Sequence, residues 1–321
     1  MVGNESGTGG GADEVTAGLR AGYEAAAPAW ADGPGPLYAR LAHVLVAAAP
    51  VPLPGAAVLD LGAGPGVAGR AALAAGARQV VAADLSLGML RRARDLRARD
   101  LRARDLRARD LRARDLRARD LRARDLRGPE LRGPDLCDPD LASGAAWRPV
   151  AADAAALPFS NHSFDLVVAA FCLNHLGSLA AGLAEVRRVG AAIAASTFAP
   201  GWDHPAKGAV DKVLRSFGYQ PPAWYACLSP GSRAGDPAVL AEHAAAAGFT
   251  DVQVRTLDVR TALAAPAELA SWRLGLAQTA PFMRSLDPPD QAAVRRAAEH
   301  AVAGLAGASP LVVSMVMLTA H

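Results

Sequence analysis

The chain has 321 residues, with 34 Lys and Arg against 31 Asp and Glu, which gives a formal net charge of +3 at pH 7. That total is dominated by seven tandem copies of ARDLR at residues 93–127, which contain fourteen Arg and seven Asp, so the rest of the chain has 20 basic and 24 acidic side chains. A mildly acidic body excludes a chain-wide electrostatic attraction to nucleic acid or to an anionic membrane.

The cysteines and the apolar runs bound the class of protein further. Three cysteines stand far apart, at Cys137, Cys172 and Cys227. Their odd number and wide spacing predict neither a disulfide framework nor a metal site. The polar N-terminus lacks a signal-peptide pattern, and no run approaches the ~18 apolar residues that a spanning helix needs. We therefore expect a cytoplasmic protein with no membrane span and no metal, and the oligomeric state stays open.

The N-terminal part is predicted to be a short tail followed by helices. Residues 1–14 are polar and Gly-rich and are expected to be disordered. Within 15–50 we predict a short helix, a Pro/Gly break at 33–36 and a second helix. Leu37, Leu41, Val44 and Leu45 share one face of that second helix. We interpret the segment as lid helices ahead of the main domain.

The next elements are a strand at 56–61, a glycine loop, a helix to about Ala75 and a strand at 79–84. Ser86 is the predicted N-cap of the following helix. That helix continues into the repeat, and 93–142 forms an insertion.

The repeat predicts a long solvated helix or a disordered arm. A period of five residues turns each leucine by about 140° around a helix, so the leucines form no coiled-coil seam. Each Asp has an Arg three residues before it and another four residues after it, which supports an isolated helix. Two interpretations remain: a tandem duplication that added no function, or an Arg-rich arm that touches nucleic acid or another protein.

After the insertion, strands and helices alternate. A third strand ends near Asp153, and further strands are predicted at 164–171, 191–198, 251–258 and 310–318. Helices are predicted at 179–189, 237–249, 266–278 and 289–304, whereas 199–236 looks less regular. This order predicts an α/β fold with a doubly wound, mostly parallel sheet of seven strands, formed by 51–92 and 143–321. Segments 199–236 and 266–304 are expected to form a helical lid.

The loop VLDLGAGPGVAG at residues 58–69 has two interpretations. Gly64, Gly66 and Gly69 fit the G-x-G-x-x-G pattern of a dinucleotide-binding loop. The run Asp60-x-Gly62-x-Gly64-x-Gly66 also fits a methyltransferase loop. Glycines let the backbone approach a ligand, and the helix that follows suits either a pyrophosphate or a carboxylate. The loop by itself does not distinguish between the two interpretations.

Two acids at strand ends narrow the choice. Asp84 closes the second strand, where a carboxylate can accept from both hydroxyls of a ribose, and Leu85 beside it can lie against a purine. Asp153 follows the third strand and precedes a Leu-Pro-Phe turn. An acid there can accept from the exocyclic amine of adenine, and a nicotinamide enzyme has no reason to have this third segment.

Taken together, VLDLGAGPG, ADLSLGML, ADAAALPFSNHSFDLVV and LNHL resemble the class I S-adenosylmethionine-dependent methyltransferases. The closest resemblance is to the small-molecule branch that includes the ubiquinone/menaquinone (type 11-like) enzymes. The resemblance covers residues 20–90 and 145–260 and implies a Rossmann-like fold with S-adenosyl-L-methionine as cofactor.

The resemblance also implies a set of contacts. Asp60 and the backbone of Gly62, Ala63, Gly64 and Gly66 surround the methionine portion, and Phe171 closes that side. Asp84 holds the ribose, Leu85 and Met89 flank adenine, and Asp153 with Ala154 reads the adenine amine. Tyr23 and Trp30 cover the cofactor, and His175 is a candidate base or orienting group.

Several of these residues also have a purely structural interpretation. Asp60 can cap the glycine turn, Met89 and Trp30 can be ordinary packing residues, and His175 can be a structural histidine. Relatives have a Pro-Gly-Gly loop before the fifth strand, and here RRVGAAIAAS is several residues short. That shortening threatens strand register more than it threatens cofactor binding.

The methyl acceptor is weakly constrained by the sequence. The chain lacks the [Asp/Asn]-Pro-Pro-aromatic turn used to methylate nucleic-acid bases, so nucleic acid is not the expected partner. The lid segments contain several aromatic residues: Trp30, Trp202, Trp224, Tyr225, Trp272 and Phe282. We expect in-line transfer to a small apolar or aromatic metabolite. An RNA methyltransferase or RNA binder that uses the Arg-rich arm, and an NAD-dependent oxidoreductase, remain as alternatives.

Overall fold

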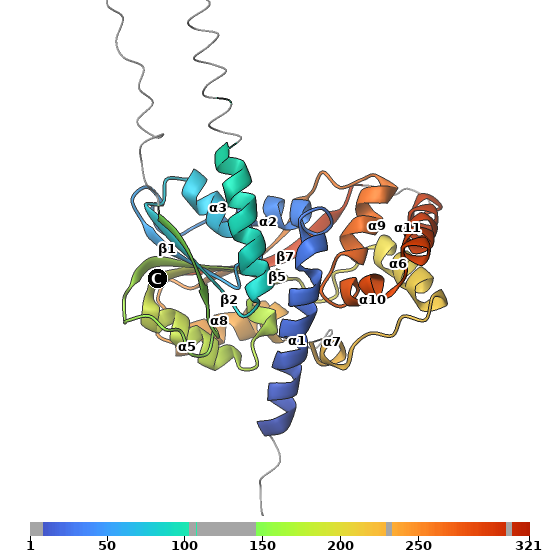
Figure 1. The fold of residues 1–321 in the computed structure, drawn as a ribbon. Coiled ribbons are helices and arrows are strands. Elements are labelled where there is room, and N and C mark those ends of the chain that lie inside the picture. Colours follow the sequence, from blue (N-terminus) through green and yellow to red (C-terminus); the bar gives the residue numbers. More distant parts are fainter. Residues whose placement is uncertain (1–8, 103–106, 108–145, 229–232, 306–309) are drawn as a thin grey trace, which may run out of the picture. The chain divides into compact units, whose positions relative to one another are not determined.

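The computed structural model describes residues 9–102, 107, 146–228, 233–305 and 310–321. The chain divides into two compact units: one combines Met1–Ala93 with Ala145–His321, and the other is Arg94–Gly144. The first unit contains the sheet and all the candidate site residues (Figure 1). Most of the repeat lies outside the described residues. Its first residues belong to a helix that spans 87–102.

Seven strands form one sheet. They are β1 (Ala57–Leu61), β2 (Gln79–Asp84), β3 (Ala146–Ala151), β4 (Phe164–Ala170), β5 (Gly190–Phe198), β6 (Gln253–Arg260) and β7 (Val312–Ala320). Their order is β3-β2-β1-β4-β5-β7-β6, and the first five strands are parallel. β7 is antiparallel to both of its neighbours. The prediction of a doubly wound, mostly parallel seven-stranded sheet is therefore confirmed.

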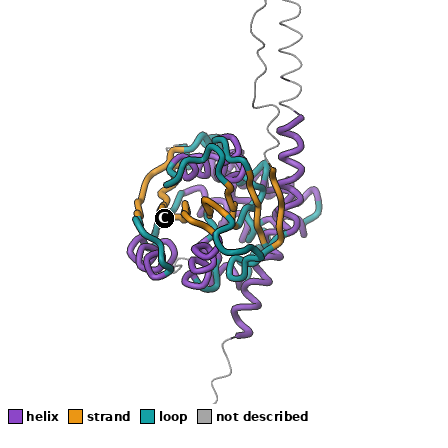
Figure 2. Tube along the Cα trace, turned by 90° about the vertical axis from the view of Figure 1, so that its left-hand side faces the viewer, coloured by secondary structure: helices purple, strands orange, loops and turns teal. Residues whose placement is uncertain are grey.

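Helices lie on both faces of the sheet (Figure 2). Side chains alternate between faces along each strand, so Val58 of β1 packs in one hydrophobic cluster and Leu59 in another. The first cluster includes α2 (Gly35–Ala47) and α3 (Val67–Ala74), and the second includes α5 (Leu179–Val189) and α8 (Pro237–Ala246). This alternation points Asp60, two residues after Val58, toward the face that α3 covers.

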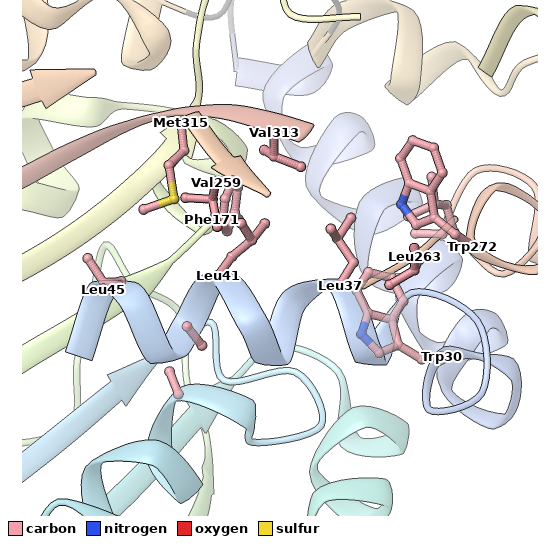
Figure 3. Packing of buried hydrophobic residues seen from close by; sticks show 14 of the residues in the cluster. Trp30, Leu37, Leu41, Leu45, Phe171, Val259, Leu263, Trp272, Val313 and Met315 are labelled. Atoms are coloured by element: carbon pink, nitrogen blue, oxygen red, sulfur yellow. The ribbon is translucent and has the colours of Figure 1, made fainter. Parts of the chain in front are cut away.

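The α2 helix is held by a stripe of leucines. Leu37, Leu41 and Leu45 are fully buried and point from α2 toward Phe171, Val259 and Met315 (Figure 3). Shortening a leucine of this kind to alanine costs about 2–5 kcal/mol. The predicted leucine face is confirmed, except that Val44 is only partly buried.

The remaining helices are α1 (Gly9–Trp30), α6 (Pro205–Ser216), α7 (Ala223–Leu228), α9 (Pro266–Leu274), α10 (Ala280–Ser285) and α11 (Pro288–Ala303). α1 packs against α7 and α10, while α6, α9 and α11 pack together. Two expectations were wrong. α1 already includes residues 9–14 of the expected disordered tail, and 199–236 contains the regular helix α6.

The short connection before the fifth strand is accommodated without a loop. α5 ends at Val189, and Gly190 is both its C-cap and the first residue of β5, paired with Phe164. A methyl group on Gly190 would lie 2.5 Å from Val167 Cγ2. The glycine thus allows helix and strand to join directly, and the register of β5 is kept.

Candidate functional site

The five parallel strands end at one edge of the sheet. The candidate site residues lie at the ends of four of them, β1, β2, β3 and β4. The strand order reverses between β1 and β4, whose neighbours β2 and β5 lie on opposite sides. Ligands of doubly wound sheets bind at such a switch point, beyond the carboxyl ends of the strands. The glycine loop after β1, Asp84 at the end of β2 and Phe171 after β4 all lie at this edge.

The glycine loop has the backbone conformation that its sequence predicts. Gly62, Gly64 and Gly66 have φ of +63°, +52° and +77°, and Gly66 is the N-cap of α3. A methyl group on Gly64 would meet nothing within 4 Å, whereas one on Gly62 would overlap Cys172. The loop therefore leaves free space beside Gly64 and packs against the chain after β4 at Gly62.

Asp60 is almost completely buried beneath this loop. Its Oδ2 accepts a hydrogen bond of 2.7 Å from the Gly69 amide in the first turn of α3. Burial raises the pKa of Asp60 to about 7, and the bond from Gly69 opposes that rise. This geometry matches the turn-capping interpretation of Asp60. A methyl group on Gly69 would lie 2.9 Å from both this carboxylate and Val80, so glycine permits the close approach of α3.

Asp84 is fixed by two backbone amides. Its Oδ2 accepts from Gly64 N and its Oδ1 accepts from Ser86 N, each at 2.8 Å. Burial raises the pKa of Asp84, while both hydrogen bonds act to lower it. The carboxylate therefore joins the end of β2 to the glycine loop, and each oxygen keeps a further lone pair for a ligand.

Asp153 lies on the neighbouring strand end. Asp84 pairs with Ala151, so Asp153 follows two residues later at the same edge of the sheet. Asp153 is exposed, and its Oδ1 accepts from Ala155 N at 2.9 Å. Ala154 is buried against the second hydrophobic cluster. The two acids therefore lie at the ends of adjacent strands, at the same edge of the sheet.

A phenol and an imidazole meet beside the end of β4. Tyr23 Oη of α1 and His175 Nε2 lie 3.0 Å apart, and their rings meet edge to face. Burial lowers the pKa of His175 to about 4 and raises that of Tyr23 well above its ordinary value. Both groups are therefore uncharged at neutral pH. In the described part of the chain, the buried His175 Nδ1 has no hydrogen-bond partner.

Phe171 begins a row of aromatic rings. It has a φ of +55°, and its amide donates to Ser196 O at 2.9 Å. Its ring lies 4.5 Å from that of Phe198 and 5.4 Å from that of Tyr38, centroid to centroid. The row continues through Trp30, Trp202 and Trp272. These rings pack mainly against one another.

Among the described residues, no three His, Cys, Asp or Glu side chains are grouped as metal ligands would be. Nor does any helix in the described ranges have the length and apolar character needed to cross a bilayer. Two surface hollows lie elsewhere, one beside α2 and α3 and the other between α6 and α11.

Comparison with known proteins gives a family profile and a fold. Residues 118–192, less than a quarter of the chain, match a profile described as a methyltransferase domain. A solved structure from Anabaena variabilis, described as a candidate methyltransferase of an antibiotic biosynthesis pathway, aligns with a TM-score of 0.51 at 15% identity. The alignment covers 87% of this chain and 96% of that one. The fold is therefore that of the class I methyltransferases.

The chain thus has the class I methyltransferase fold, and part of it matches a methyltransferase family profile.

Two further solved structures align with lower TM-scores. A candidate sarcosine dimethylglycine methyltransferase from Galdieria sulphuraria is 16% identical, with a TM-score of 0.42 and coverage of 84% of this chain and 80% of that one. An S-adenosylmethionine-dependent methyltransferase from Mesorhizobium loti is 18% identical, with a TM-score of 0.43 and coverage of 86% and 95%. A search of curated proteins found no significant match.

The sheet also differs from that of a dinucleotide-binding fold. A dinucleotide-binding Rossmann sheet has the strand order 3-2-1-4-5-6. Here the antiparallel β7 lies between β5 and β6. The G-x-G-x-x-G match of the loop is therefore coincidental, and its third glycine, Gly69, serves the packing of α3.

Four further sequence-predicted residues differ in how well their positions fit the predicted roles. Met89 is fully buried in the first hydrophobic cluster, which favours packing over contact with a nucleobase. Trp30 is also buried in that cluster. Leu85 is half-buried beside Asp84, as a purine contact would need. The predicted N-cap at Ser86 is confirmed, since its Oγ accepts from Met89 N at 3.1 Å.

Sequence reasoning missed Glu24. Its Oε2 accepts from Ser86 Oγ at 2.8 Å and from Gly88 N at 2.7 Å. These groups are separated by more than sixty residues in the chain, and Glu24 belongs to no motif. The sequence offered no signal for this contact, whereas Tyr23, one residue earlier, was singled out.

Proposed function

We propose that this protein is a methyltransferase that transfers the methyl group of S-adenosylmethionine to a small apolar or aromatic metabolite bound under the N-terminal helix. The observation that supports the proposal best is the bond from Gly64 N to the Asp84 carboxylate, beside free space at the Gly64 α-carbon. The acid that would bind the ribose thus lies next to a loop of glycine and other small residues, which suits an amino-acid-linked nucleoside.

The residues at the strand ends fit the donor. Asp84 would hold the ribose hydroxyls, and Leu85 would lie against the adenine ring. Asp153 and Ala154 would read the adenine amine. The backbone of Gly62, Ala63, Gly64 and Gly66 would surround the methionine portion, with Asp60 beneath it and Phe171 closing the side toward β4. The mainly backbone-lined loop suits a zwitterionic amino-acid group, because the first turn of α3 offers free amides and a partial positive charge.

When bound, the donor supplies a sulfonium that already activates its methyl group, so the protein mainly has to align the acceptor and exclude water. Tyr23 and His175 would align the acceptor. A histidine with a pKa of about 4 is a weak base, which favours an orienting role over proton removal. Its unpartnered Nδ1 would gain a hydrogen bond from or to the acceptor.

The surroundings of this pair favour an apolar or aromatic acceptor. The ring centroids of Tyr23 and Trp30 lie 5.4 Å apart, and Tyr38 and Phe171 continue the aromatic surface. The helices of 15–50, 199–236 and 266–304 would cover the acceptor. Because many of the rings fill the core, the support comes from the apolar character of the region and not from a lined cavity.

Calorimetry with S-adenosylhomocysteine tests the cofactor assignment. Asp84→Ala should weaken binding at least about tenfold, since it removes charge-assisted hydrogen bonds. Asp165→Ala is the matched control, because Asp165 Oδ2 also accepts from a backbone amide, Ala57 N at 2.8 Å, but at the amino ends of β4 and β1. Equal affinity of Asp84→Ala and wild type would reject the ribose assignment. A screen of phenolic and polar acceptors with labelled donor then tests the acceptor class.

A further inference from the structure

Residues 22–24 of α1 contact separate parts of the fold in succession. Gly22 faces the indole of Trp224, so that a methyl group there would lie 2.8 Å from Trp224 Cζ2. Tyr23 reaches His175 after β4. Glu24 reaches the chain just beyond β2.

Glu24 makes that contact with two groups. Its carboxylate accepts from Ser86 Oγ and Gly88 N, at the start of the helix that follows the ribose-binding acid. Ser86 N in turn donates to Asp84, and Ser86 Oγ accepts from Met89 N. A hydrogen-bonded chain therefore runs from the α1 carboxylate through Ser86 to the Asp84 carboxylate.

The contact has the features of an energetically favourable one. The bonds from Gly88 N and Ser86 Oγ lower the pKa of Glu24, so it is ionised at neutral pH. A carboxylate at the first turn of a helix is stabilised by the free amides there. A methyl group on Gly88 would lie 2.7 Å from Glu24 Oε1, so an alanine at 88 would make the Glu24 carboxylate shift.

We propose that Glu24 is a positioning residue that clamps α1 onto the ribose side of the cofactor site and so couples donor binding to closure of the helix that bears Tyr23. The inference rests on the proposed function. Donor binding fixes Asp84 and Ser86, and the fixed Ser86 holds Glu24 and the adjacent Tyr23 in place. Without the carboxylate, the donor site and the acceptor side of the chain would move independently.

Two variants separate the clamp from a general effect on folding. Glu24→Ala removes the acceptor oxygen, and Glu24→Gln keeps an oxygen that can accept both hydrogen bonds. Glu268→Ala is the matched control, because its Oε2 accepts from Ala264 N and Ala265 N at the start of α9. We expect Glu24→Ala to weaken S-adenosylhomocysteine binding about tenfold, with Glu24→Gln within about threefold of wild type and Glu268→Ala unchanged.

Gly88→Ala gives an independent measurement. Alanine favours the helix intrinsically, yet its methyl group would displace Glu24, so affinity should fall as it does in Glu24→Ala. In the Glu24→Ala background, the same change should have no further effect. Additive losses in this double-mutant cycle would overturn the clamp.

Amide exchange of α1 supplies a readout that does not need turnover. S-adenosylhomocysteine should slow exchange across residues 14–30 in wild type and much less in Glu24→Ala. If wild type binds the probe and Glu24→Ala shows the same affinity and the same protection, the clamp is wrong and the cofactor site stands. If wild type binds no S-adenosylhomocysteine, the proposed function itself fails.

Discussion

Tyr23 Oη and His175 Nε2 lie 3.0 Å apart, although 152 residues separate them in the chain. The bond joins the N-terminal helix to the short turn after β4, where the switch point of the sheet lies. A neutral phenol and a neutral imidazole can hold an acceptor in line with a methyl group without bringing a charge into the site.

Tyr23→Phe should lower kcat at least about tenfold and leave the KM for the donor within about twofold, because only the orientation of His175 is lost. Initial rates with varied donor concentration measure both constants. Tyr219→Phe is the control. The Tyr219 hydroxyl donates to Gln278 O over 3.1 Å and takes no part in the Tyr23–His175 contact. A rise in donor KM with unchanged kcat would place Tyr23 at the cofactor instead.

The parts of this architecture that depend on local pattern could be predicted. Apolar strand runs, the helix boundaries around 179–189 and the glycine loop follow from side-chain periodicity and from the need for positive φ. The acids at strand ends followed because parallel strands end at one edge. Contacts between helices that are far apart in the sequence, such as Glu24 with Gly88, depend on how separate elements dock.

The missed helix α6 shows a different limit. His204 caps it, Pro205 occupies its first turn, and Val210 and Leu214 form a buried stripe one turn apart. Those signals are present in the sequence, but Trp202 and the neighbouring Gly and Pro residues favour an irregular segment. The packing of α6 on α9 and α11 decides the outcome, and that tertiary contact cannot be read from spacing.

His175 should make the protein sensitive to mild acid. Its pKa falls from 6.5 in the unfolded chain to about 4 in the fold, so the folded state binds fewer protons between these values. The stability it contributes is complete above pH 6.5 and is lost as pH falls toward 4, at up to about 1.4 kcal/mol per pH unit. Urea unfolding of wild type and His175→Asn at pH 7 and pH 5 measures this. A parallel pH dependence of the two proteins would contradict it.

Asp60 should change the pH dependence of stability in the opposite direction from His175. Its pKa rises from 3.8 to about 7 on folding, so the folded state binds the extra proton and stability falls as pH increases between these values. Asp60→Asn keeps an oxygen that can accept from Gly69 N and removes the buried charge. It should therefore be more stable than wild type at pH 8, by about 1–3 kcal/mol, with a smaller difference at pH 5. The exposed Asp165→Asn serves as control, and a pH-independent difference at Asp60 would argue against the burial effect.

Gly62 and Gly64 should respond differently to the same substitution. Alanine in the left-handed region costs about 1–2 kcal/mol at either position. At Gly62 the methyl group also overlaps Cys172, so thermal stability should fall further, and Cys172→Gly should restore part of it. At Gly64 the methyl group enters open space, so S-adenosylhomocysteine affinity should fall about tenfold while the fold is kept. Equal effects on affinity would mean that the free space at Gly64 does not receive the donor.

Removing the repeat should leave cofactor binding intact. Residues Ala93 and Trp147, which flank the insertion, both lie within 4 Å of the position that a methyl group on Gly66 would occupy. Both residues belong to the first unit, so a Gly/Ser linker can replace the second unit, residues 94–144. We expect S-adenosylhomocysteine affinity within about threefold of wild type, because all the proposed contacts lie in the first unit. The same variant tests the Arg-rich arm: if wild type binds RNA with a steep salt dependence and the deletion abolishes it, the repeat is a nucleic-acid contact and not a duplication without function.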